Sequence, residues 1–238
     1  MSKLLLVGLV LLGTVFGAAG TWIAERVAPG GLDGADKTRI ERVVRDYVLA
    51  NPELLPEAMQ KLQDRETGKL ISATRGAIET PIGDAWAGNP RGDVTVVEYY
   101  DYNCGYCRAI LPTIDRLIAA DPRLRIVYRE LPILTESSRE AARASIKAAE
   151  QGRFARFHKA LYAAGPVTAR TIAAAARTAR VDLSKPSAGA DEEIARNLAI
   201  ASRLGMTGTP SWVIGDRVLS GALPLDQLKD AVAAARAR

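Results

Sequence analysis

The chain is poor in cysteine and histidine. Its 238 residues include only two cysteines, Cys104 and Cys107, and one histidine, His158. Because both cysteines belong to one short motif, no structural disulfide can join distant parts of the chain, and the core alone must stabilise the fold. A structural zinc site needs four ligands and no second Cys-x-x-Cys pair exists, so we expect no metal. His158 lies among regularly spaced apolar residues and is expected to be a structural or surface residue, not a ligand.

Long runs of like charge are also missing. The formal net charge of +5 at pH 7 is spread along the chain. Basic residues are not interleaved with aromatic ones, and no nucleic-acid-binding signature is present, so we expect no nucleic-acid partner. An apolar fraction of 48% and a charged fraction of 25% are typical of a globular protein with an ordinary core.

The two cysteines form the motif Cys104-Gly105-Tyr106-Cys107 at the junction of a strand and a helix. An apolar β-run, residues 94–100, precedes the motif, and a helical pattern begins near Arg108. The unpaired N–H groups of a helix N-terminus favour a thiolate at the first sulfur. Two thiols at this spacing can close and reopen a small disulfide, so the motif predicts thiol–disulfide exchange. We expect Cys104 to be the nucleophile and Cys107 to resolve the mixed disulfide.

The N-terminus carries an uncharged segment between Lys3 and Glu25. As a secretory signal, it would have an apolar core over residues 4–16 and small residues for cleavage at 18–20. As an anchor, it is just long enough to span a bilayer, which needs about 20 apolar residues. Both alternatives imply export to a compartment where a disulfide can persist. We therefore assign residues 1–24 to a signal peptide or membrane anchor and residues 25–34 to a linker.

Residues 35–80 are expected to form an N-terminal helical module. Apolar residues recur at helical spacing on both sides of Asn51-Pro52, which has the character of an N-cap followed by a proline at the first helical position. Two amphipathic helices ahead of a complete domain need a partner surface. They either pack on that domain or bind other copies of the chain, and we favour a homo-oligomer through residues 35–80.

Residues 81–238 read as an α/β domain with the element order β-α-β, a helical insertion over about 136–204, then β-β-α. Strands are expected at residues 94–100 and 124–130, parallel to each other by the right-handed crossover rule. Residues 211–214 and 217–220 should form a hairpin around Gly215-Asp216, and residues 225–235 a closing helix.

Three segments resemble a known family. These are Y-Y-D-Y-N-C-G-Y-C-R (residues 99–108), T-G-T-P-S-W-V-I (residues 207–214) and Y-V-L-A-N-P-E-L-L (residues 47–55). The first two, with the element order above, resemble the thioredoxin fold of DsbA-like thiol–disulfide oxidoreductases. The third resembles the N-terminal region of Com1-like members and of ScsC-like members, the suppressors of copper sensitivity. The likeness covers nearly everything after residue 35.

The resemblance implies roles for five further residues. It places a cis-proline at Pro210, with Thr209 and Pro210 offering backbone groups to an extended substrate, although Pro210 alone would fit an ordinary turn. Gly105, which permits close backbone approach to the sulfurs, and Tyr106 fill the positions that tune the site and meet substrate. The prototype has Pro-His there, so this departure leaves the oxidising strength open. Glu98 is implied to assist proton transfer at the deeper cysteine, whereas the residue alone fits an exposed strand end equally well.

The resulting hypothesis is an exported enzyme that forms, reduces or isomerises disulfides in protein substrates. A monomeric oxidase and an oligomeric isomerase or reductase both fit, and the helices at 35–80 favour the second. We expect protein substrates with cysteines, a membrane redox partner and no cofactor. The expected location is the bacterial cell envelope, either the periplasm or the inner membrane facing it. One alternative is a copper-binding stress protein that uses the same thiolates. A redox-dead interaction module is disfavoured by the intact motif.

Overall fold

The computed structural model describes residues 34–237. The chain divides into two compact units, one ending at Gln60 and one comprising Lys61–Arg238. The expected signal or anchor at 1–24, and the expected linker except for Gly34, lie outside the described residues. Among residues 34–237, no helix has the length and apolar character needed to cross a bilayer.

The N-terminal unit contains helix α2, Gly34–Ala50, and the first part of α3, Leu54–Glu79. Asn51 closes α2, because its side-chain amide donates to the Tyr47 carbonyl oxygen at 2.8 Å, and α3 begins only at Leu54. The expected N-cap role of Asn51 is therefore replaced by a role at the preceding helix end. α2 buries none of its residues. The large apolar side chains exposed on these helices are Ile40, Val43, Val44, Tyr47, Leu49, Leu55, Met59 and Leu62.

A five-stranded sheet forms the centre of the second unit, in the order β1-β3-β2-β4-β5. Its strands are β1 (Trp86–Gly88), β2 (Val94–Tyr100), β3 (Leu124–Glu130), β4 (Ser211–Ile214) and β5 (Arg217–Ser220). β2 and β3 are parallel, as predicted, and every other pairing is antiparallel. β1 was not predicted, because three residues are too few to show an alternating pattern.

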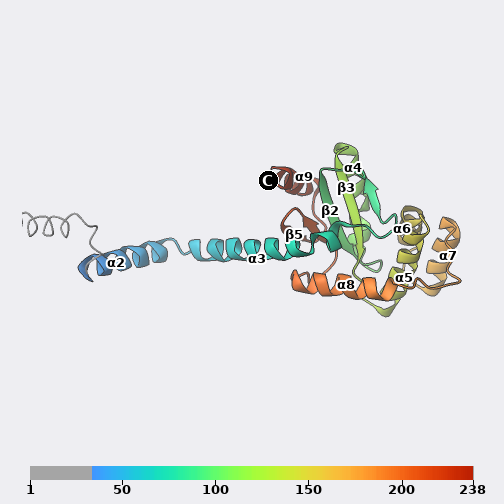
Figure 1. Ribbon diagram of the computed structural model, residues 1–238, viewed down its shortest axis with the longest axis horizontal. Coiled ribbons are helices and arrows are strands. Elements are labelled where there is room, and N and C mark those ends of the chain that lie inside the picture. Colours follow the sequence, from blue (N-terminus) through green and yellow to red (C-terminus); the bar gives the residue numbers. More distant parts are fainter. Residues whose placement is uncertain (1–33, 238) are drawn as a thin grey trace, which may run out of the picture. The chain divides into compact units, whose positions relative to one another are not determined.

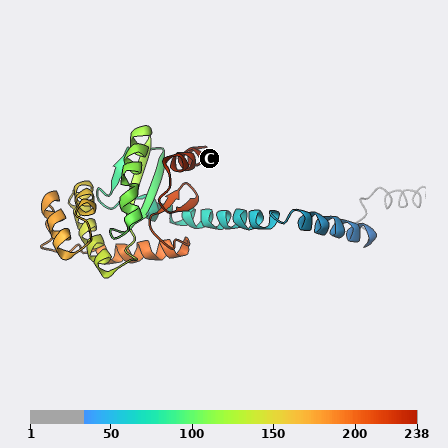
Figure 2. The same ribbon diagram turned by 180° about the vertical axis from the view of Figure 1, so that it is seen from behind.

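Helices cover both faces of this sheet. Because side chains alternate along a strand, Val96, Ile126 and Trp212 face one side and Val97, Val127 and Val213 the other. The first side packs on α4 (Gly105–Ala120) and α9 (Leu225–Arg236). Figure 2 shows α4, in green, lying in front of the strands. The second side packs on the end of α3 and on α8 (Ala190–Arg203). The predicted α/β thioredoxin fold is confirmed.

Four helices form the insertion between the two halves of the sheet. They are α5 (Glu136–Glu150), α6 (Phe154–Ala163), α7 (Ala169–Ala179) and α8. Helices α5, α6 and α7 pack against one another beside the sheet (Figure 1), and their shared core includes both cysteines. The insertion therefore supplies one wall of the cysteine site.

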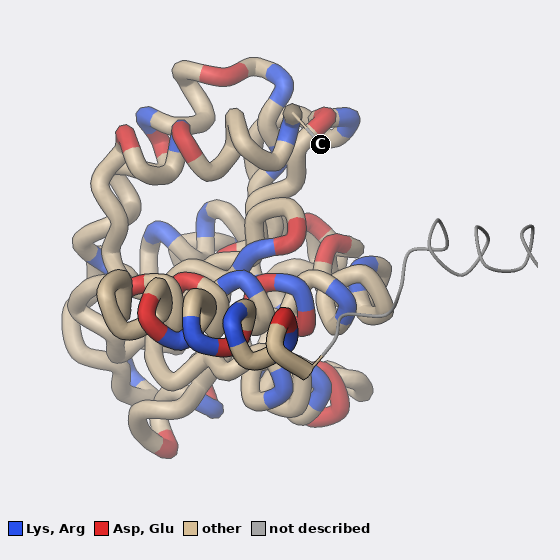
Figure 3. Tube along the Cα trace, turned by 90° about the vertical axis from the view of Figure 1, so that its left-hand side faces the viewer, with Lys and Arg blue, Asp and Glu red and all other residues tan. Residues whose placement is uncertain are grey.

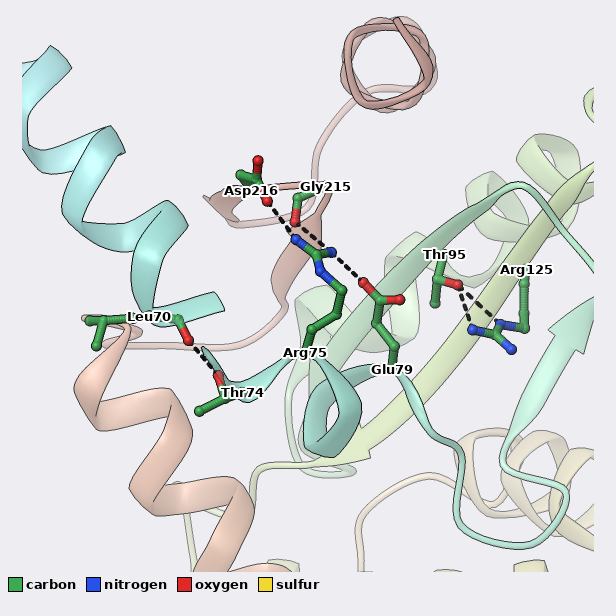
Figure 4. A network of polar contacts seen from close by, with 8 residues as sticks. All are labelled: Leu70, Thr74, Arg75, Glu79, Thr95, Arg125, Gly215 and Asp216. Carbon is green, nitrogen blue, oxygen red and sulfur yellow. Dashed lines mark hydrogen bonds and ion pairs between the residues drawn. The ribbon is translucent and has the colours of Figure 1, made fainter. Parts of the chain in front are cut away.

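The second half of α3 packs within the second unit. Ile71 and Ile78 are fully buried in the cluster beneath α8. Arg75 donates to the Asp216 carboxylate at 2.5 Å and to the Gly215 carbonyl oxygen, both in the β4–β5 turn (Figure 4). The apolar pattern had grouped residues 61–79 with the N-terminal module, but α3 is one continuous helix that enters both compact units.

A buried arginine fixes the end of α3. The Arg129 guanidinium donates to the carbonyl oxygens of Ala77, Ile78 and Thr80, which the helix end leaves without helical partners. Its remaining nitrogen lies 2.7 Å from the Glu193 carboxylate on α8, and both side chains are more than nine-tenths buried. One charged group thus joins β3, α3 and α8.

Charged residues of both signs are interspersed on the described chain, as Figure 3 shows for Lys and Arg against Asp and Glu. Several form exposed ion pairs, such as Arg143 with Asp191 at 2.7 Å. Pairs of this kind contribute little to stability, typically about 0–1 kcal/mol.

We predict that Arg129→Met destabilises the fold by roughly 3–5 kcal/mol, because it leaves Glu193 buried without its main partner. Arg143→Met, which removes an exposed pair, should change the free energy of unfolding by less than about 1 kcal/mol. Urea denaturation of both variants measures the two effects. Equal losses in the two variants would show that the Arg129 pair is not a structural anchor.

Candidate active site

Cys104 occupies the N-cap of α4, with an extended backbone at φ −79° and ψ 115°. Its sulfur accepts the Cys107 N–H at a distance of 3.4 Å, and its own N–H donates to the Asp101 carbonyl oxygen. The strand-to-helix junction predicted from the sequence therefore places the first sulfur at the donor end of the helix. A positive helix end stabilises negative charge on a group in this position.

A loop distant in sequence closes over this sulfur. The Thr209–Pro210 peptide bond is cis, and the Cys104 thiol donates to the Thr209 carbonyl oxygen at 3.1 Å. Pro210 is buried, and its carbonyl oxygen accepts the Gly221 N–H at 2.8 Å. The structure thus brings the predicted substrate-binding residues Thr209 and Pro210 beside the predicted nucleophile.

The two residues between the cysteines differ in character. Tyr106 is 70% exposed, and its ring is available to a protein bound at the site. At Gly105, an added Cβ would meet no atom within 4 Å. A side chain at position 105 would therefore meet no other part of the described chain, and the tuning role expected of Gly105 stays a prediction.

The second sulfur is more deeply placed than the first. Cys107 is fully buried, whereas Cys104 retains 6% exposure. Burial, reinforced by the nearby Glu98 carboxyl group, raises the pKa of the Cys107 thiol. Cys107 therefore stays protonated until a base accepts its proton.

Glu98 is buried beneath the start of α4. It is 1% exposed on β2, so the alternative of an exposed strand end does not hold. Burial, and secondarily Cys104, raises the pKa of its carboxyl group to about 8, and Oε2 has no hydrogen-bond partner. Glu98 is thus neutral at most pH values below 8, and its Oε2 makes no hydrogen bond.

A polar cluster behind the cysteines was not anticipated. The Tyr100 hydroxyl donates to the Glu130 carboxylate, and the Tyr102 hydroxyl lies 2.9 Å from Ser145 Oγ and 3.0 Å from His158 Nδ1. Burial lowers the pKa of His158 to about 3 and raises that of Glu130 to about 8. His158 is therefore a neutral, structural residue, as expected. The period-two spacing of the two tyrosines was the only sequence signal for this cluster.

Within the described chain, the two cysteines do not belong to a larger cluster of metal ligands. Among residues 34–237, no three His, Cys, Asp or Glu side chains lie close enough together to hold an ion. Met206, near the proline loop in sequence, packs in the cluster beneath α8, apart from the cluster that holds the cysteines.

Two family models match the chain. The DSBA-like thioredoxin domain matches residues 95–233, more than half of the sequence. The chain belongs to the DSBA-like thioredoxin family. A second model, the copper resistance protein ScsC N-terminal domain, matches residues 36–67. As a family member, the chain has the fold of thiol–disulfide oxidoreductases, with an ScsC-like N-terminal region.

Solved structures of similar proteins agree with this assignment. A thioredoxin-like oxidoreductase from Silicibacter pomeroyi is 39% identical, with a TM-score of 0.65, over 69% of this chain and 98% of that one. Proteus mirabilis ScsC in a transitional conformation is 26% identical, with a TM-score of 0.66, over 88% and 99%. The thiol-disulfide exchange protein α-DsbA2 of Wolbachia pipientis is 26% identical, with a TM-score of 0.63, over 73% and 97%.

One curated relative is named as an antiporter. The Na(+)/H(+) antiporter NhaA 3 of Salinispora tropica is 29% identical over an alignment of 185 residues that covers 72% of this chain. The chain spans only 28% of the length of that relative. The match therefore concerns a segment of a much longer protein.

We predict that Glu98 makes the stability of the reduced protein depend on pH. The folded carboxyl group keeps its proton up to pH about 8, whereas the unfolded group releases it near 4.5. Folded chains thus bind more protons between these values, and the free energy of unfolding should fall as pH rises through this window, by roughly 3–5 kcal/mol. Urea denaturation at several pH values, compared with Glu98→Gln, isolates this contribution.

The exposed Glu140 provides the control, because Glu140→Gln should follow the wild-type pH profile. If Glu98→Gln also follows it, the carboxyl group of Glu98 is not held neutral in the folded protein.

Proposed function

We propose that the chain is an exported thiol–disulfide oxidoreductase that acts on protein substrates through Cys104 and Cys107. One observation carries the proposal: the Cys104 sulfur lies at the N-terminus of α4 and against the cis-proline loop, 3.1 Å from the Thr209 carbonyl oxygen. A helix end favours the thiolate that exchange requires, and the loop offers backbone groups to an extended peptide.

The exchange proceeds in two displacements. The Cys104 thiolate attacks one sulfur of a substrate disulfide; a Cys104–substrate bond forms, and the other substrate sulfur leaves and takes up a proton. Cys107 then gives its proton to ionised Glu98 and attacks the Cys104 sulfur, which releases the second substrate thiol. The substrate gains two electrons and the chain becomes a disulfide. The reverse sequence forms a disulfide in the substrate.

The depths of the two sulfurs support this division of roles. Only Cys104 retains exposure, so a substrate sulfur meets it first. Cys107 is buried one turn further along α4 and stays protonated, so it is silent until the mixed disulfide has formed. The exposed ring of Tyr106 and the Thr209–Pro210 backbone then flank the substrate.

Assembly through α2 and the start of α3 would favour an isomerase or reductase over a monomeric oxidase. The eight apolar side chains exposed on these helices recur at helical spacing and need a cover. Copies of the chain joined there would offer several cysteine pairs to one misfolded substrate. We place the protein in the periplasm or at the inner membrane, where a membrane redox partner would reset Cys104 and Cys107.

Copper binding is a second candidate, favoured by the match of residues 36–67 to a copper resistance family. Cys104 and Cys107 offer two soft thiolates for Cu(I). Titration of the reduced protein against a Cu(I) chelator tests this candidate, and affinity no tighter than about micromolar would remove it.

We predict that Cys107→Ser accumulates mixed disulfides between Cys104 and protein substrates, because no second thiol resolves them. Reduction of insulin should slow by on the order of 100-fold or more. Non-reducing electrophoresis and mass spectrometry measure the adducts, and Cys104→Ser, which lacks the nucleophile, is the control. Adducts on Cys107 in the Cys104→Ser variant would reverse the assigned roles.

We predict that the wild-type chain scatters light as a multiple of the protomer mass and that Val43→Glu with Tyr47→Glu reduces it to a monomer. Both side chains are at least 60% exposed on α2, and a buried carboxylate would oppose association. Arg45→Glu, about half a turn away from Val43, should leave the mass unchanged. A wild-type monomer would refute assembly through these helices. Recovery of scrambled ribonuclease should fall in the double variant.

A further inference from the structure

The turn before Cys104 is tied to the loop that leads into the helical insertion. Asp101 is 1% exposed, and its carboxylate accepts three backbone N–H groups. One comes from Asn103, at 2.8 Å, within the same turn. The other two come from Ile133 and Leu134, each at 3.0 Å, in the connection from β3 to α5. A single buried carboxylate thus joins two loops about 30 residues apart.

Asn103 adds a second tie between the same two segments. Its side-chain amide lies 2.8 Å from Thr135 Oγ1 and 3.0 Å from the hydroxyl oxygens of Ser137 and Ser138. Thr135 is the N-cap of α5, and its hydroxyl accepts the Ser138 N–H. Asp101 therefore holds the middle of the connecting loop, and Asn103 holds its junction with α5.

The same turn fixes the reactive cysteine. The Asp101 carbonyl oxygen accepts the Cys104 N–H at 3.0 Å and the Tyr162 hydroxyl at 3.2 Å. Through its backbone Asp101 orders Cys104, and through its side chain it orders Ile133 and Leu134. These two apolar side chains are 42% and 49% exposed, so they form a surface next to the site that a substrate can touch.

We propose that Asp101 and Asn103 are positioning residues that hold the 131–135 loop in register with Cys104. They thereby determine which protein substrates exchange, and they leave the intrinsic reactivity of the sulfur unchanged. The inference rests on the proposed exchange activity, and it concerns how substrates are selected. Substrates with an apolar side chain near the reactive cysteine would gain most from a correctly placed Ile133 and Leu134.

The geometry demands a carboxylate at position 101. Each of its oxygens faces backbone N–H donors, with Oδ1 accepting one and Oδ2 accepting two. An asparagine of equal size would present an NH2 group to at least one of these donors in either orientation. Asp101→Asn therefore replaces the charged acceptor with a neutral one and loses at least one of the three bonds, which weakens the tie with little change in volume. Asp115→Asn makes the same charge change at an exposed position of α4.

Hydrogen exchange tests the tie in the full chain, independently of activity. In Asp101→Asn, the amides of Ile133 and Leu134 should exchange at least about tenfold faster, whereas Asp115→Asn should match wild type. Asn103→Ala, a milder change at a half-buried position, should accelerate exchange at residues 135–138. Unchanged protection in both site variants would overturn the positioning role.

Comparing a protein substrate with a small disulfide tests whether Asp101 affects the selection of substrates. In Asp101→Asn, kcat/KM for a reduced or scrambled protein should fall about tenfold, chiefly through KM. The rate of Cys104 with a small disulfide, oxidised glutathione, should stay within about twofold of wild type. An equal loss with both substrates would place the effect on the sulfur and overturn the proposal. A wild-type chain inert to both would instead refute the exchange function, while the hydrogen-exchange result would still stand.

Discussion

The antiparallel pairing of β2 with β4 is the constraint on which the site depends. Tyr99 lies opposite Ser211, so the residues that follow β2 and those that precede β4 meet at one edge of the sheet. Cys104 reaches this edge from one strand, and Thr209 and Pro210 reach it from the other. A shift by one residue would turn every side chain of β4 to the other face and separate Trp212 from its cluster beneath α4 and α9. The register of these largely buried strands thus brings the Cys104 sulfur and the Thr209–Pro210 loop together.

The polar groups inside this domain fall into two kinds. Arg129, Glu193 and Glu130 have close partners, so their burial is offset by ion pairing or hydrogen bonding. Glu98 lies in the same interior, but one of its oxygens has no partner. Both Glu98 and Glu130 have a pKa raised to about 8 by burial. Only Glu98 also raises the pKa of Cys107, so it is the acid coupled to the sulfurs.

Much of this arrangement was predictable from the sequence, and what was missed has a common physical cause. Strands β2 to β5 and the helices of the insertion follow from local periodicity and from turn residues such as Gly215-Asp216. The continuity of α3 could not be predicted in this way. Ile71 and Arg75 stabilise its second half through contacts with β4, β5 and α8, and the local sequence of α3 does not encode these contacts. The ties made by Asp101 were likewise invisible, since they join backbone N–H groups about 30 residues away.

Burial of Glu98 connects stability with chemistry. Below pH about 8 the carboxyl group is neutral, which suits its apolar surroundings but leaves it unable to accept the Cys107 proton. As pH rises towards this value, the ionised fraction grows, and in the proposed mechanism the resolving step gains its base. The same ionisation places a charge in the interior and lowers the free energy of unfolding. In the proposed mechanism one proton governs both effects, so we expect a substitution that stabilises the domain at position 98 to slow release of the mixed disulfide. Burial of a carboxyl group with an unpartnered oxygen costs free energy that packing does not offset, and the proposed proton transfer accounts for an acid at this point of β2.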